Sequence, residues 1–152
     1  MGSQYCQPAD MIATGINSIA LNAIPTADLQ TACQQASELA DSWGFRPRYG
    51  ANTPVLLAWG GDVTYNAALV AVYLAMRARG YNPSAGADDN IFRGYSEAQQ
   101  WFRDIGHGNV TPDVSPNVPI GQNQGADLPQ VSTSQQRGWL TKNGNGTPTV
   151  GW

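Results

Sequence analysis

The stretch DVTYNAALVAVYLAMRAR, Asp62 to Arg79, decides the fold of this chain. Asp62 is a favoured helix cap, the two arginines near the end suit the negative end of a helix, and Gly80 follows. One apolar face consists of Val63, Ala67, Val70, Ala71, Leu74 and Ala78, and a second consists of Tyr65, Leu69, Val72, Tyr73 and Met76. A helix that is apolar nearly all round must be covered on both sides. We therefore expect either the central helix of a compact bundle or a helix whose second face meets a neighbouring copy.

Two further helices are expected before this one. A short helix begins at Pro8 and is ended by Gly15, and a longer one is capped by Thr26 and stopped by Gly44. The longer helix has an apolar stripe made of Leu29, Ala32, Cys33, Ala36, Leu39, Ala40 and Trp43. Residues 16–25 between them are ambiguous between a short turn and an extended link.

The last predicted helix begins at Ser96, which forms a capping box with Gln99. Its apolar face consists of Ala98, Trp101, Phe102 and Ile105. Gly106 or Gly108 is expected to supply the left-handed C-cap. The glycines, prolines and polar residues of 44–61 and 81–94 indicate loops.

Helical periodicity disappears from His107 onward. Prolines interrupt the segment at Pro112, Pro116, Pro119, Pro129 and Pro148. The polar composition is typical of disorder, yet Trp139 and Trp152 indicate a segment that other chains hold in place. The sequence thus predicts an all-α fold, with a small bundle of about four helices in 1–106 and a long extended C-terminal arm in 107–152. The expected core residues are Leu39, Trp43, Val70, Leu74, Trp101, Phe102 and Ile105.

Composition narrows the function classes. The chain has 152 residues, a formal net charge of -3 and only 12% charged residues, against about 25% in typical domains. Such a low charged fraction suits a protein with much of its surface against partners. The acidic pI of about 4.8 argues against wrapping nucleic acid with a basic face. Cys6 and Cys33 lack metal-ligand spacing, and we expect a reduced protein with Cys33 in the core.

No catalytic constellation emerges from the sequence. His107 is the one histidine and has no evident partner, so a C-cap or interface role is favoured over catalysis. Asp88 and Asp89 indicate a solvated acidic loop. Arg46 and Arg48 could grip a phosphate, but hydrogen bonds to helix-end carbonyls or to a neighbouring subunit are the simpler interpretation. We expect no enzymatic activity, no cofactor and no metal.

Three stretches, in this order, resemble the head–tail adaptor (connector) proteins of tailed bacteriophages, most closely those of the Mu-like branch. Pro8, Ala9 and Asp10 match an opening motif; Asp41, Ser42, Arg48, Tyr49 and Pro54 match a central one; Tyr95, Ala98, Trp101, Gly108 and Val110 match a closing helix and the turn after it. The chain departs from the pattern at Gln7, Trp43, Gly44 and Phe102 and in its long tail. The likeness covers roughly the first 110 residues.

The resemblance implies a helical subunit in a ring, usually twelvefold, that lies below the portal, docks the stopper or tail and extends the channel for double-stranded DNA. It implies a virion protein assembled in the host cytoplasm, without sequence-specific DNA binding and without a membrane. The alternatives are another neck or tail ring protein, such as a stopper or terminator, and a small intracellular adaptor whose tail folds onto a protein partner. The residues expected at subunit or portal interfaces are Arg46, Arg48, Tyr49, Tyr73, Trp139, Leu140 and Trp152.

Overall fold

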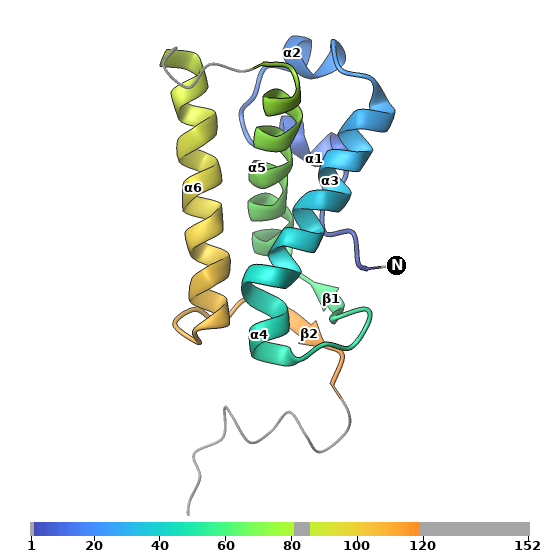
Figure 1. Cartoon of the computed structure of the whole chain (residues 1–152), viewed down its shortest axis with the longest axis vertical. Helices are drawn as coiled ribbons and strands as arrows, with labels where there is room; N and C mark the ends of the chain where they lie inside the picture. The colour runs from blue at the N-terminus through green and yellow to red at the C-terminus, as the bar shows by residue number, and fades with distance from the viewer. Residues whose placement is uncertain (1, 81–85, 119–152) are drawn as a thin grey trace, which may run out of the picture. The chain divides into compact units, whose positions relative to one another are not determined.

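The computed structural model describes residues 2–80 and 86–118, and these form a mostly helical fold in which three long helical segments pack side by side (Figure 1). The helical fold class predicted from the sequence is confirmed. The helices are α1 (Pro8–Ile12), α2 (Ser18–Asn22), α3 (Thr26–Ala40), α4 (Arg46–Tyr49), α5 (Gly61–Ala78) and α6 (Gly86–Gly106). A π-helical segment, η1 (Asp41–Phe45), joins α3 to α4, and two short strands are β1 (Leu56–Trp59) and β2 (Val114–Pro116).

Helix α5 is the central helix of the bundle. It packs against α3 on one side and α6 on the other, and α1 also contacts it. Its fully buried residues are mostly small or β-branched, namely Val63, Ala67, Ala68, Val70, Ala71, Val72 and Ala75. Small side chains let neighbouring helices approach closely. Helix α5 is therefore packed between α3 and α6 of the same subunit. Of the two alternatives for the second apolar face, the structure shows the central helix of a bundle: Leu69 and Tyr73 on this face contact α6, while Tyr65 is exposed.

Helix α6 begins ten residues earlier than the sequence predicted, at Gly86 rather than at Ser96. The expected capping box is therefore wrong, because Ser96 lies inside the helix. The polar segment before it is helical because Ile91 and Tyr95 extend the apolar stripe backwards at helical spacing. Gly94 lies inside this helix, at a position where a Cβ would come within 3.1 Å of the Leu69 side chain.

The second predicted stop signal, Gly44, also does not end its helix. The chain continues through η1 and α4 and turns away only at Gly50, whose φ is +99°. A Cβ on Gly44 would lie 2.5 Å from the carbonyl oxygen of Phe102, and one on Gly106 would lie 2.7 Å from that of Trp43. The two glycines thus permit backbone contact where η1 crosses α6, and this packing requirement explains Gly44.

Helix α6 ends at Gly106, and of the two glycines expected to supply a left-handed C-cap it is Gly108, two residues later, that has positive φ. Gly108 has a φ of +81°, and its N–H donates to the carbonyl of Ile105 at 2.9 Å. The N–H of Asn109 reaches back to the carbonyl of Asp104 at 2.8 Å. This left-handed turn reverses the chain and returns it to the bundle.

The returning chain forms the sheet that the sequence did not predict. Strand β2 pairs antiparallel with β1, with Leu56 opposite Pro116 and Trp59 opposite Val114. Pro112 is buried, and the N–H of Asn117 donates to the carbonyl of Val55 at 2.7 Å. The compact unit therefore runs to Val118, and residues 107–118 belong to it rather than to an arm that leaves the subunit. The remaining predicted arm, 119–152, lies outside the described residues.

Three of the predicted core residues, Val70, Phe102 and Ile105, are fully buried. The other four, Leu39, Trp43, Leu74 and Trp101, are partly buried and pack against the core. Phe102 meets Phe45 edge to face, with ring centroids 5.7 Å apart. The sequence does not predict this partner from η1, because the glycines and prolines of 44–61 indicate a loop there.

Replacement of Gly44 by alanine is expected to lower the free energy of unfolding by about 1–3 kcal/mol, the usual cost of forcing extra atoms into a packed interior. The backbone of α6 cannot give way as a flexible side chain would. Gly61→Ala is the matched control, since it is also helical and a Cβ there meets nothing within 4 Å. Urea unfolding that gives equal stabilities for the two variants would contradict the proposed role of Gly44.

Candidate functional site

Acidic and sulfur-bearing residues do not gather into a catalytic centre in the part of the chain that the structure describes. Within residues 2–80 and 86–118, no group of three or more His, Cys, Asp or Glu side chains could hold a metal ion. Asp89 forms an exposed ion pair with Arg93 at 3.0 Å, and His107 is exposed just after α6. In the same ranges, no helix is both long and apolar enough to cross a membrane. The search for a functional site therefore turns to surfaces.

Arg48 tethers the segment that follows α6. Its Nη1 donates to the carbonyl of Val110 and, at 3.5 Å, to that of Ile105. Its Nη2 lies 3.4 Å from the hydroxyl of Thr111. The sequence-based alternative of hydrogen bonds to helix-end carbonyls is confirmed for this residue. Arg48 is half-buried and serves its own fold.

The other predicted interface residues divide between surface and interior. Arg46 is exposed. Tyr49 is half-buried and lies under the Arg48 guanidinium, 5.4 Å from its ring centroid. Tyr73 is half-buried and stacks on Tyr95 of α6 with ring centroids 4.0 Å apart, so it holds α5 against α6. Trp139, Leu140 and Trp152 lie outside the described residues.

A buried polar cluster fastens the N-terminal segment to the end of α3. The hydroxyl of Tyr5 donates to Oδ1 of Asp41, and both residues are almost wholly buried, at 1% and 2% exposure. The N–H of Tyr5 donates to the hydroxyl of Ser37 at 2.9 Å. Sequence reasoning missed this cluster, because no local pattern connects residues so far apart in the chain.

Burial raises the pKa of the Asp41 carboxyl above its ordinary value, and this outweighs the hydrogen bond from Tyr5, which lowers it. Burial also raises the pKa of Tyr5 above its usual range. The folded protein thus holds the Asp41 proton more tightly than the unfolded chain does. Stability from this carboxyl is fully present below about pH 4, the unfolded pKa of Asp, and is lost as the pH rises through the folded pKa.

Asp41→Asn replaces this carboxyl by a neutral side chain that still accepts a hydrogen bond. We expect the melting temperature of the variant, relative to the unmodified protein, to increase steadily from pH 4 to pH 8, because only the unmodified protein must ionise a buried group. Melting curves of both proteins across this range provide the check. A difference that does not change with pH would show that Asp41 is not a raised carboxyl.

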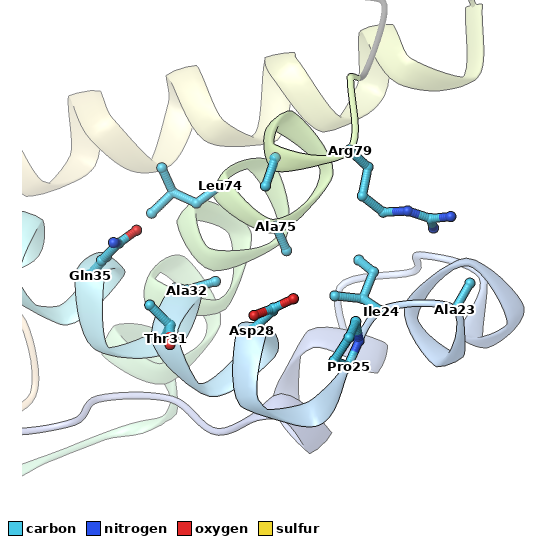
Figure 2. Close-up of a pocket in the computed structure, with 11 residues that line it drawn as sticks. Ala23, Ile24, Pro25, Asp28, Thr31, Ala32, Gln35, Leu74, Ala75 and Arg79 are labelled. Atoms are coloured by element: carbon cyan, nitrogen blue, oxygen red, sulfur yellow. The ribbon is translucent and has the colours of Figure 1, made fainter.

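Two grooves lie along α5. The first, of about 290 Å³, lies between the start of α3 and the end of α5. Figure 2 shows Leu74 and Ala75 facing α3 across it, with Gln35 and Arg79 toward opposite ends. Its lining is mixed, because Asp28, Thr31, Gln35 and Arg79 add charged and polar groups to the apolar side chains.

The second groove, of about 340 Å³, lies between the α1–α2 connection, α5 and α6. Its apolar lining comes from Ile16, Leu69, Val72, Met76 and Ile91. Large apolar side chains are also exposed elsewhere on the bundle, namely Ile12, Ile19, Leu57, Tyr65 and Phe92. Together with the grooves they form the candidate interaction surfaces.

No family model, curated protein or solved structure matches this chain.

Proposed function

We propose that this chain is a structural subunit of the neck of a tailed bacteriophage particle, where copies form a ring between the portal and the stopper or tail. The observation that carries the proposal is that stretches resembling the adaptor family meet in one place. Arg48 from the central stretch donates to the carbonyl of Val110 from the closing stretch. Trp43, beside the central stretch, meets Tyr95 edge to face with ring centroids 6.2 Å apart. These contacts hold η1 and α4 against α6 and the turn that follows it.

The charge of the chain supports a channel that DNA passes through without being held. A net charge of -3 avoids the cumulative attraction that lysines and arginines exert on phosphates. Which residues line the channel depends on how the subunit is oriented in the ring.

Closure of a ring requires two different faces of the same subunit to be complementary. The two grooves lie on different sides of α5, and exposed apolar side chains such as Ile12 and Ile19 are 50% and 74% accessible. A single contact between two such small surfaces would bind weakly, but the contacts of all the subunits add up when the ring closes. The isolated subunit is accordingly a monomer that closes into a ring on the portal.

Beyond Val118, we propose that residues 119–152 form a strap to the portal or to an adjacent adaptor. Trp139 and Trp152 are the proposed anchors, because tryptophan is enriched among residues that dominate binding energy. The alternation of apolar and polar residues in LPQVS suits an extended chain in a groove. The similar stretch NVPIG begins with Asn117 and Val118, which belong to the compact unit.

A stop codon early in the gene, in the phage that encodes this chain, tests the function directly. We expect DNA-filled heads without attached tails, and rescue when the chain is supplied in trans. Normal tailed particles would reject the neck proposal. Capture of a single host protein with normal particle assembly would favour the small adaptor instead.

Charge reversal at Arg46 tests the proposed subunit contact. Arg46→Glu is expected to leave the free energy of unfolding within about 0.5 kcal/mol, because the side chain is exposed, while reducing the number of tailed particles at least tenfold. Arg48→Glu is the comparison. It removes the hydrogen bond from Arg48 to the carbonyl of Val110, so we expect this variant, unlike Arg46→Glu, to have a lower melting temperature. Normal tail attachment in Arg46→Glu particles would exclude Arg46 from the interface.

A further inference from the structure

Two cysteines that are distant in the sequence meet in the core. Cys6 and Cys33 are 1% and 0% exposed, and both are free thiols. The two thiols are close enough that each changes the pKa of the other, and the Cys33 thiol donates to the sulfur of Met11 at 3.8 Å. The three sulfur atoms lie where the N-terminal segment, α1 and α3 come together.

The backbone holds the two cysteines in register. The N–H of Tyr5, next to Cys6, donates to the Ser37 hydroxyl at 2.9 Å, and that hydroxyl donates to the carbonyl of Cys33 at 2.9 Å. Ser3 adds a hydrogen bond to the carbonyl of Leu56 at 3.3 Å. Cys6 is thereby fixed beside one turn of α3, so its contact with Cys33 is a consequence of the fold.

The two thiols differ in their ease of ionisation. The hydrogen bond with Cys33, together with burial, raises the pKa of Cys6, whereas the same hydrogen bond lowers the pKa of Cys33. A thiolate that accepts a hydrogen bond from a neighbouring thiol is the arrangement in which thiol–disulfide exchange begins.

We propose that Cys6 and Cys33 are an oxidisable pair that forms an intramolecular disulfide and fastens the N-terminal segment to α3. The oxidant is a small disulfide such as oxidised glutathione. One cysteine loses its proton and attacks a sulfur of the oxidant, which releases one thiol and leaves a mixed disulfide. The second cysteine loses its proton and attacks the protein-bound sulfur, which releases the second thiol. Both cysteines are oxidised, and the small disulfide is reduced to two thiols.

The bond would close a loop that contains α1, α2 and the first half of α3. Such a link stabilises a protein mainly by restricting the unfolded chain. Its timing rests on the proposed function, because a particle assembled in a reducing cytoplasm meets oxidising surroundings only after release. The neck subunit would then be assembled with free thiols and locked afterwards.

Oxidation of the purified full-length chain tests the pair. The protein is incubated with oxidised glutathione, denatured, alkylated with iodoacetamide, weighed and mapped by peptide mass spectrometry. We expect a monomer lighter by two hydrogen atoms, with no alkylated cysteine and a linked peptide that joins Cys6 to Cys33. The melting temperature should increase by about 5–15 °C and return to its starting value on addition of dithiothreitol.

Cys6→Ser and Cys33→Ala are the controls, and neither should gain stability on oxidation. A denatured sample in the same reagent shows whether both thiols can react. The proposal fails if the native chain keeps two alkylatable thiols while the denatured chain loses them, if each cysteine instead carries glutathione, or if the linked protein melts no higher than the reduced one. Absence of the chain from phage necks would remove the proposed timing and leave the disulfide result standing.

Discussion

Replacement of Phe102 by alanine is expected to lower the free energy of unfolding by about 3–5 kcal/mol, the range for deleting a fully buried aromatic side chain. Phe102 is 0% exposed and meets the ring of Phe45 in η1 at 5.7 Å and that of Trp101 at 5.2 Å. The alanine variant would have a cavity where α6 packs against η1. Since small domains have only about 5–15 kcal/mol of stability, the variant would lose a large fraction of it.

Trp101→Ala provides the comparison within the same helix. Trp101 is only partly buried, so its replacement should cost about half as much as that of Phe102, or less. Urea unfolding of the two variants measures the difference. An equal or larger cost at Trp101 would mean that the core is centred on a different face of α6.

Truncation after Asn109 is expected to destabilise the fold, whereas truncation after Val118 is expected to leave it intact. The first removes β2, the Val110 carbonyl that binds Arg48, and buried Pro112, and the melting temperature should fall by about 10 °C or more. The second ends at the boundary of the compact unit, and the melting temperature should change by no more than about 2 °C.

The second truncation also isolates the proposed strap. Chains that end at Val118 should fold normally, yet heads should fail to retain the adaptor or the tail. Infectious particles assembled from these chains would disprove the strap while leaving the ring itself in place. A large drop in melting temperature would show that 119–152 cover their own bundle instead.

Apolar stripes were sufficient to predict α3 and α5, but the expected caps were wrong. Thr26 and Asp62 lie inside their helices, whose N-cap positions are Pro25 and Gly60. The local signals also failed where glycine serves tertiary packing. Gly44 and Gly94 resemble helix breakers in the sequence, yet both lie in helical backbone at close approaches. A Cβ on Gly44 would collide with the backbone of α6, and one on Gly94 would be in tight contact with the Leu69 side chain. The pairing of β1 with β2 was also beyond prediction, since two strands of four and three residues carry almost no periodic signal.

The candidate surfaces were predicted less completely than the fold. The aromatic and basic character of 45–49 drew attention to Arg48, but only the structure places its guanidinium on the carbonyls that follow α6. No sequence motif predicts the two long-range pairs, Tyr5 with Asp41 and Cys6 with Cys33, because their members come together only through packing of distant segments. The apolar pattern of α5 also did not show which of its residues are exposed, because α6 covers much of its second face.

The most direct test of the neck proposal is a reconstruction of the portal vertex from purified particles, with this chain located in the density. The account predicts a closed ring of copies below the portal, with cyclic symmetry, in which each copy contains the α3–α5–α6 bundle and a segment beyond Val118 that reaches a different chain. Particles that lack the chain, or that contain it only away from the neck, would contradict the account.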